Sequence, residues 1–271
     1  MAAFIAPGPT LIKVFGPEMA KGVGCYVQNF RFPKTDEHQT MTTLHLDLAP
    51  SLGTLTKDSM IMMDDKLKVL IAGMMRELAK LKLVTNLSWE QVVSVCMQDP
   101  LMEPFDEPIS KKDNFTKEGK HAFKFDGSPD PAIVQEVSAW FKKLINDDDV
   151  LKSTTINDEN IEFMGRIVAQ TGATIDDFLS FFHKDERHEQ TMVDIGVLRF
   201  PEIQRPFFQV YRIKLVAFSS SERTLAWQSD HNGITGEYNS RKFKPREYII
   251  KDLLPEVKAK AMKEANDVFA D

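Results

Sequence analysis

The side chains with the densest potential for chemistry lie between residues 183 and 189, where two histidines stand among three carboxylates. Imidazole nitrogens and carboxylate oxygens are ligands that zinc and related metals accept. On a helix, however, His183 and His188 point about 140° apart, because they are five residues apart. We therefore expect this segment to be a solvated helix end, and we expect no metal site.

A pair of adjacent carboxylates, Asp176 and Asp177, has the residue type that general acid–base catalysis uses. The pair follows Thr174, a suitable N-cap for a helix over residues 174–190, and carboxylates in a first helical turn stabilise the helix dipole. The sequence has no phosphate-binding loop, dinucleotide fingerprint, zinc-protease motif or serine-hydrolase motif. We expect a protein that is not an enzyme and binds no cofactor.

Composition places the chain among globular proteins, since 42% of its 271 residues are hydrophobic and 27% are charged. Its first residues lack the basic segment and apolar run of a secretion signal, and Cys25 and Cys96 are too few for a disulfide framework. The nearest approach to a membrane-spanning helix, residues 69–75, is short and flanked by charges. We expect a cytoplasmic protein.

Charge is distributed unevenly along the chain. The net charge is −6, yet residues 192–251 contain ten Lys and Arg against six Asp and Glu, so this region carries +4 and the remainder −10. A basic region of this kind can face anionic lipid, RNA, or an acidic patch of the same protein. The acidic pI of 5.6 and the lack of an RNA-recognition motif argue against nucleic acid as a partner.

Hydrophobic periodicity predicts helices in the middle of the chain and strands at both ends. Predicted helices cover residues 58–83, 88–99, 131–145, 157–172, 174–190 and 248–269, and predicted strands cover residues 10–15, 24–32, 41–49, 192–200, 207–218, 223–230 and 234–243. Ser88 and Gln91 form a capping-box pattern, and Asn232-Gly233 is typical of a tight hairpin turn. Residues 100–131 are rich in Pro and charge, and this pattern fits either a short exposed strand or a mobile loop.

These elements predict an α+β protein in which a twisted antiparallel sheet, built from both ends of the chain, is flanked by helices from the middle. We expect one domain over residues 1–246 and a C-terminal helical tail over residues 247–271.

The strands at 192–200 and 207–218 are close to the length of about 9–11 residues that crosses a bilayer core. In the second strand, Arg212 and Lys214 share a face with Phe208, Val210, Val216 and Phe218. The opposite face, formed by Phe207, Gln209, Tyr211, Ile213, Leu215 and Ala217, has Gln209 as its one strongly polar residue. Such a strand is able to face lipid on one side and water on the other.

The segments MVDIGVLRF (192–200), RPFFQVYRIKLVAF (205–218) and ITGEYNSRKFKPR (234–246), with the β-rich ends and helical middle, resemble the gasdermin pore-forming domain. The nearest resemblance is to short fungal members of the regulator-of-cell-death type. This resemblance implies binding to acidic phospholipids, refolding of internal segments into amphipathic hairpins, oligomerisation as a β-strand pore, and cell death by permeabilisation. We therefore expect a cytoplasmic protein that relocates to the membrane on activation.

The resemblance also gives candidate residues and partners. The lipid-binding candidates are the basic residues Lys13, Lys21, Arg31, Lys34, Arg212 and Lys214. The membrane-hairpin candidates are the apolar residues Val193, Ile195, Val197, Phe207, Tyr211, Ile213 and Leu215. The expected partners are acidic membranes, further copies of the chain, and an allelic partner protein or an activating protease, while control is expected from the C-terminal tail, proteolysis or that partner.

Two other classes of protein fit the same sequence. A cytolysin of the Cyt-like type would share the mixture of helices and strands and the membrane activity, but it would be secreted. A non-enzymatic binding or assembly protein, such as a viral or structural component, would form stable oligomers without lipid.

Overall fold

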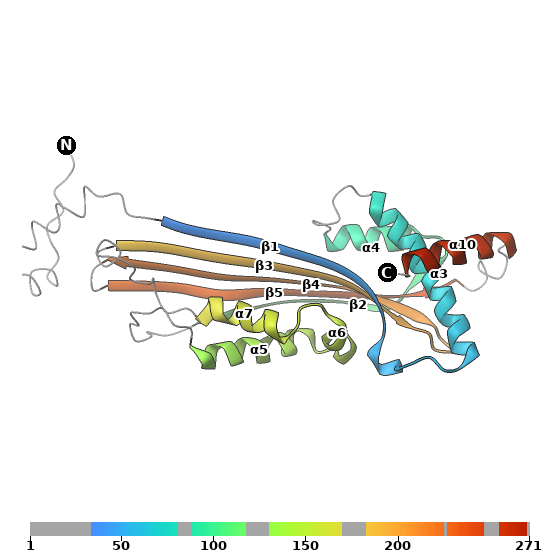
Figure 1. Ribbon diagram of the computed structural model, residues 1–271, viewed down its shortest axis with the longest axis horizontal. Helices are drawn as coiled ribbons and strands as arrows, with labels where there is room; N and C mark the ends of the chain where they lie inside the picture. Colours follow the sequence, from blue (N-terminus) through green and yellow to red (C-terminus); the bar gives the residue numbers. More distant parts are fainter. Residues whose placement is uncertain are drawn as a thin grey trace, which may run out of the picture.

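A five-stranded sheet runs along the molecule, and helices pack against both of its faces (Figure 1). The computed structural model describes residues 34–80, 88–117, 130–169, 183–224, 227–246 and 255–269. The strands are β1 (Lys34–Leu48), β2 (Met102–Thr116), β3 (His183–Phe200), β4 (Phe207–Thr224) and β5 (Trp227–Pro245), in the sheet order β1-β3-β4-β5-β2. The helices are the 3₁₀-helix η1 (Pro50–Leu52), α3 (Asp58–Lys80), α4 (Trp89–Gln98), α5 (Pro131–Ile145), α6 (Asp148–Ser153), α7 (Asp158–Ala169) and α10 (Pro255–Val268).

The fold class predicted from the sequence, α+β, is confirmed, but two features of the predicted sheet are wrong. The sheet is mixed, because β1 pairs with β3 in parallel, whereas β3, β4 and β5 form an antiparallel meander. In addition, β2 comes from the middle of the chain and pairs with β5. A parallel pair needs a long crossover connection, and the helical segments between β1 and β3 make such a connection possible.

The two faces of the sheet have separate hydrophobic cores. On one face, α5, α6 and α7 lie along the strands and pack against residues such as Ile213, Leu215 and Tyr238. On the other face, α3 and α4 gather at one end of the sheet and pack against residues such as Val193 and Phe208. Because successive side chains of a strand point to opposite faces, β4 contributes its odd-numbered residues to the first core and its even-numbered residues to the second.

Local sequence signals explain where several helices begin and end. Ser88 caps α4 through the predicted capping box, in which its hydroxyl accepts from the Gln91 amide and the Gln91 side chain accepts from the Ser88 amide. Asp130 caps α5, which has Pro131 in its first turn and ends at Asn146 in the left-handed conformation (φ 48°). The predicted helices at 58–83, 88–99, 131–145 and 157–172 match α3, α4, α5 and α7 within their described residues.

Two local predictions are wrong. Residues 183–189, expected at a helix end, belong to β3, where they pair with β4. Asn232 and Gly233, expected in a tight turn, lie inside β5, so β4 and β5 are joined at residues 225–226 instead. A Cβ at Gly233 would lie 2.8 Å from Cζ of Phe218 and 2.9 Å from the carbonyl oxygen of Phe115, so glycine is needed here for the close approach of both neighbouring strands and not for a turn.

The edge strand β2 is irregular near its start. Its register with β5 shifts between Phe105 and Ile109, and Asp106 has a positive φ of 60°. Pro104 precedes this bulge and Pro108 lies within it. Proline lacks the amide that a further strand would need, and bulges of this kind are common at sheet edges.

Three further predictions concern the ends of the chain and the membrane. The predicted strands at 10–15 and 24–32 lie outside the described residues, whereas the strand at 41–49 corresponds to the second half of β1. The predicted terminal helix is described as α10, over Pro255–Val268. Among the described helices, none has the length and apolar character that crossing a membrane would require.

We predict that Gly196→Ala destabilises the fold by about 1–3 kcal/mol, because overpacking a filled site has costs of that size. A Cβ at Gly196 in β3 would overlap the ring of Tyr211, which is fully buried and cannot move aside. Gly73→Ala in α3 is the matched control: the nearest atom to its new Cβ lies 3.7 Å away, and alanine favours a helix. Urea denaturation measures both variants, and equal stabilities would contradict the prediction.

Candidate functional site

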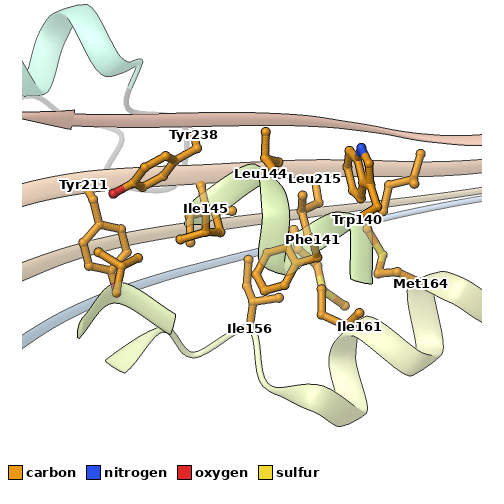
Figure 2. Packing of buried hydrophobic residues seen from close by; sticks show 14 of the residues in the cluster. Trp140, Phe141, Leu144, Ile145, Ile156, Ile161, Met164, Tyr211, Leu215 and Tyr238 are labelled. Carbon is orange, nitrogen blue, oxygen red and sulfur yellow. The ribbon is translucent and has the colours of Figure 1, made fainter. Parts of the chain in front are cut away.

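The apolar face of β4 is covered by the α5–α7 helices. Tyr211, Ile213 and Leu215 have no exposed surface. Figure 2 shows this packing: Tyr211, Leu215 and the β5 residue Tyr238 lie on the strands. The residues that cover them in the same core include Trp140, Phe141, Leu144, Ile145, Ile161 and Met164 of α5 and α7, and Ile156 of the segment between α6 and α7. The three β4 candidates therefore form part of a closed core in this state of the protein.

The membrane-hairpin candidates do not share one surface. Val193, Ile195 and Val197 of β3 are buried on the opposite face, against α3 and α4. On the β4 apolar face, the β3 residues opposite Ile213 and Tyr211 are Asp194 and Gly196. A β3–β4 hairpin would therefore place a carboxylate in the middle of its apolar face.

The remaining apolar candidate, Phe207, begins β4. Its ring stacks on Phe200 with centroids 4.4 Å apart and meets the edge of Phe105 at 5.3 Å. Phe207 therefore packs at the end of the sheet where β3 turns into β4, away from the centre of the strand.

Of the basic candidates, two have described side chains. Lys13, Lys21 and Arg31 lie outside the described residues, and Lys34 is placed only as the first residue of β1. Arg212 and Lys214 share the face of β4 that points away from α5–α7. Arg212 is only 12% exposed, and its Nη1 lies 3.7 Å from Glu237 of β5. Burial lowers the pKa of Arg212, while the charges of Glu237 and Glu90 oppose that shift.

A polar cluster that the sequence analysis missed lies on the α5–α7 face. Its centre is the fully buried carboxylate of Asp194 in β3, and we call it the Asp194 cluster, formed by Asp194, His45, Asp47, Tyr211, Thr43, Thr154 and Thr155. Asp194 accepts hydrogen bonds from the hydroxyls of Thr154 (2.6 Å), Thr155 (2.8 Å) and Thr43 (2.8 Å). A buried carboxylate is tolerated only when its oxygens are satisfied in this way.

His45 of β1 links the other members of the Asp194 cluster. Its Nδ1 lies 2.7 Å from Asp47, while its Nε2 lies 2.8 Å from the Tyr211 hydroxyl and 3.3 Å from Asp194. Burial acts to lower the pKa of His45, but hydrogen bonds and charge attraction from Asp194 and Asp47 raise it above its ordinary value. Burial acts to raise the pKa of Asp194, but His45 and the threonine hydroxyls hold it below its ordinary value.

A second polar contact anchors the same helical segment. Asp147, the N-cap of α6, accepts from the Val150 amide, from Nε2 of Gln209 at 2.9 Å and from the Tyr238 hydroxyl at 3.3 Å. Asp147 at one end of α6 and Thr154 at the other are thus both bonded to the sheet. Burial, followed by the charge of Asp147, raises the pKa of Tyr238, so its phenol stays protonated and remains a donor.

The Asp194 cluster holds helices in place; its central carboxylate is buried, while the Asp47 side chain is 45% exposed. Tyr211 is fully buried, and burial followed by the charges of Asp194 and Asp47 raises its pKa, so it is neither an accessible nucleophile nor an anion. One feature of the sequence could have identified Asp194 as a site residue: it is a charged residue inside the apolar strand MVDIGVLRF. Its donors come from three distant segments, which the sequence pattern did not connect.

Neither a metal site among the described residues nor a matching protein family indicates a function. Within the described residues, no group of three or more His, Cys, Asp or Glu side chains is arranged to hold a metal ion. No protein-family model and no curated protein matches the chain.

We predict that the Asp194 cluster makes stability depend on pH. The raised pKa of His45 means that its contribution is complete below its ordinary pKa of about 6.5 and is lost as pH rises through the folded-state pKa. The lowered pKa of Asp194 means that its contribution is complete above about 3.9 and is lost as pH falls through its folded-state pKa.

The measurement is the free energy of unfolding between about pH 5 and pH 9, compared between the unmodified protein and His45→Gln. The unmodified protein should lose stability relative to the variant as pH rises across this range. His231→Gln, which removes an exposed histidine of β5 outside the Asp194 cluster, is the matched control. Parallel profiles for the unmodified protein and His45→Gln would refute the assignment.

Proposed function

We propose that this protein permeabilises membranes: it binds acidic phospholipids, self-associates and inserts a hairpin of long β-strands. The observation that carries the proposal is the amphipathic character of β4 and β5. These strands are 18 and 19 residues long, beyond the usual range of about 3–10 residues in globular proteins and longer than the roughly 9–11 residues that cross a bilayer core.

The pairing of β4 with β5 separates apolar from polar side chains. On the face toward α5–α7, the cross-strand pairs are Ile213 with Tyr238, Leu215 with Gly236, and Ala217 with Ile234. On the opposite face they are Arg212 with Asn239, Lys214 with Glu237, and Val216 with Thr235. A hairpin of this kind suits lipid on its first face and water on its second.

This pairing favours a different hairpin from the one that the sequence suggested. The β3–β4 hairpin has Asp194 on its apolar face, whereas the β4–β5 pairs beside Ile213, Leu215 and Ala217 have no charged side chain there. In strand-based membrane proteins, Arg or Lys on the lipid face at the bilayer centre costs roughly 2–4 kcal/mol, and Asp or Glu costs less but still opposes insertion. We therefore propose β4–β5 as the inserting hairpin, with Arg212 and Lys214 on its aqueous side.

Insertion requires the α5–α7 helices to leave the apolar face of the sheet. Asp147 and the Asp194 cluster anchor these helices through hydrogen bonds, which water can replace. The apolar side chains of the sheet that the helices cover would be surrounded by lipid instead. In this proposal the described structure is the inactive, cytoplasmic state. The proposed trigger is a protease or an allelic partner protein, and the proposed outcome is cell death. The resemblance to fungal gasdermins supports the trigger and the outcome.

We predict that the protein releases dye from liposomes containing phosphatidylserine or cardiolipin and not from pure phosphatidylcholine liposomes. The double variant Arg212→Glu, Lys214→Glu should lower release at least about tenfold, because each basic residue near an anionic surface contributes about 1 kcal/mol. The control with the same charge change is Lys142→Glu, Lys143→Glu on the exposed side of α5, which should retain release.

Thermal unfolding of each variant shows whether lost release reflects lost folding. Release by the folded Arg212→Glu, Lys214→Glu variant at the unmodified rate would remove the role assigned to these residues. No release from any liposome, with stable oligomers in solution, would instead support a non-enzymatic assembly protein.

The helix α10 is proposed as a restraint on this activity, because it is attached by a small contact. Ala265 is its one buried residue among those described, Glu264 lies 3.3 Å from Arg76 of α3, and Phe269 lies 4.7 Å from the guanidinium of Arg199. Arg199 also bonds Asp64 of α3 at 2.8 Å. The docking of α10 is thus connected to the contact between α3 and the sheet.

We predict that Ala265→Glu increases dye release several-fold, because a buried carboxylate without a partner would detach α10 from α3. Ala259→Glu makes the same substitution on the exposed side of α10 and should not change release. Removal of residues 255–271 should reproduce the effect of Ala265→Glu. Unchanged or lower release from both would show that α10 is not a restraint.

A further inference from the structure

A hollow of about 330 Å³ lies on the sheet face opposite α5–α7, beside the first turn of α4. Trp89 and Glu90 of α4, Lys112 of β2, Arg212 of β4, and Glu237 and Asn239 of β5 form most of its lining. Its size is at the lower end of the range for small-molecule sites, about 300–1,000 Å³. Four separate elements therefore bring charged groups to one concave place.

The cationic groups with ion-pair partners in the hollow are Arg212 and Lys112; Lys111 also lines the hollow, but its ammonium group donates to the carbonyl of Ile145 in α5. Arg212 is largely buried, yet within the described residues its Nε has no hydrogen-bond acceptor. Lys112 donates to Glu237 at 3.2 Å from a side chain that is 69% exposed, so its ammonium group is accessible from solvent. An arginine fork with an open donor, together with an accessible ammonium group, suits the oxygens of a phosphate group.

The anionic groups lie in the same hollow. Glu237 lies between Lys112 and Arg212, and Glu90 enters from α4 close enough for its charge to act on Arg212. Trp89 is partly buried against the second core and adds an aromatic wall. A simple anion would meet two carboxylates here and a simple cation would meet two basic groups, so neither matches the hollow alone.

We propose that this hollow binds a phosphorylated amine, with the phosphate on Arg212 and Lys112 and the ammonium group on Glu90, Glu237 and the face of Trp89. Opposite charges separated by a few bonds match the alternating charges of the lining, and an ammonium group is attracted to an indole face. The ligand is either a free phosphorylated amine or the headgroup of phosphatidylserine or phosphatidylethanolamine. As a headgroup site, the inference rests on the proposed membrane function.

Calorimetric titration of the full chain tests the site with soluble probes: O-phosphoethanolamine, inorganic phosphate and ethanolamine. O-Phosphoethanolamine should bind at least about tenfold more tightly than either of its halves, a difference of about 1.4 kcal/mol. Equal affinity for inorganic phosphate would overturn the proposal, because the carboxylates would then have no role. Absence of binding by all three probes would also overturn it.

Variants assign the two ends of the ligand. Glu90→Gln, at an exposed position, should weaken O-phosphoethanolamine binding and strengthen phosphate binding, because it removes a negative charge beside the phosphate, whereas Lys112→Gln should weaken both. Lys242→Gln is the matched control, because Lys242 pairs with Asp106 elsewhere on the sheet. Loss of binding in Lys242→Gln equal to that in Lys112→Gln would refute the site.

Vesicles distinguish the two sources of the ligand. Phosphatidylserine and phosphatidylglycerol vesicles carry the same net charge, but only the first has an amine. Tighter binding to phosphatidylserine that Glu90→Gln abolishes would identify a headgroup site, and equal vesicle binding with a positive titration would identify a free ligand. Dye release separates this result from the proposed function: a positive titration without release would reject the pore alone, and release without any probe binding would reject the hollow alone.

Discussion

The burial of one carboxylate constrains much of this structure. Asp194 lies in the middle of a strand with no exposed surface, so its oxygens must find donors in other elements. They find them in Thr43 of β1 and in Thr154 and Thr155, which follow α6. The same group therefore fixes the parallel pairing of β1 with β3 and the position of the helical segment above them. If any one donor were removed, the carboxylate of Asp194 would keep fewer hydrogen bonds. This dependence makes the arrangement specific, and its cost is the free energy of removing an ion from water.

The sheet between the two helical layers is sensitive to register for a related reason. Odd-numbered residues of β4 enter the core with α5–α7, and even-numbered residues enter the core with α3 and α4 or reach the charged hollow. A slip of one residue would exchange these sets and bury Arg212 among Leu144 and Trp140. The long strands are thus held in place by chemistry that differs between their two faces, and that same difference makes the β4–β5 hairpin amphipathic.

The sequence predicted local structure better than it predicted long-range pairing. The capping box at Ser88, the first-turn position of Pro131 and the alternation in β4 depend on neighbours within a few residues, and these predictions agree with the structure. The parallel position of β1 and the donors of Asp194 depend on contacts between distant segments, from 39 residues for Thr155 to 151 residues for Thr43, which periodicity does not reveal. Asn232-Gly233 has the composition of a turn, but the ring of Phe218 and the carbonyl oxygen of Phe115 in the neighbouring strands explain its glycine. In the candidate site, the sequence predicted that Arg212 and Lys214 share one face of β4. It did not predict that the carboxylates of Glu237 and Glu90 lie near Arg212.

The bulge in β2 also makes the two margins of the sheet unequal. Pro104, Pro108 and the positive φ of Asp106 interrupt the outer row of amides on that side. Along β1, by contrast, residues 34–48 contain no proline and pair with β3 without a break in register. A further strand would meet an interrupted row of amides along β2, so backbone pairing there would be incomplete. The irregular start of β2 thus protects that margin of the sheet against extension by another chain.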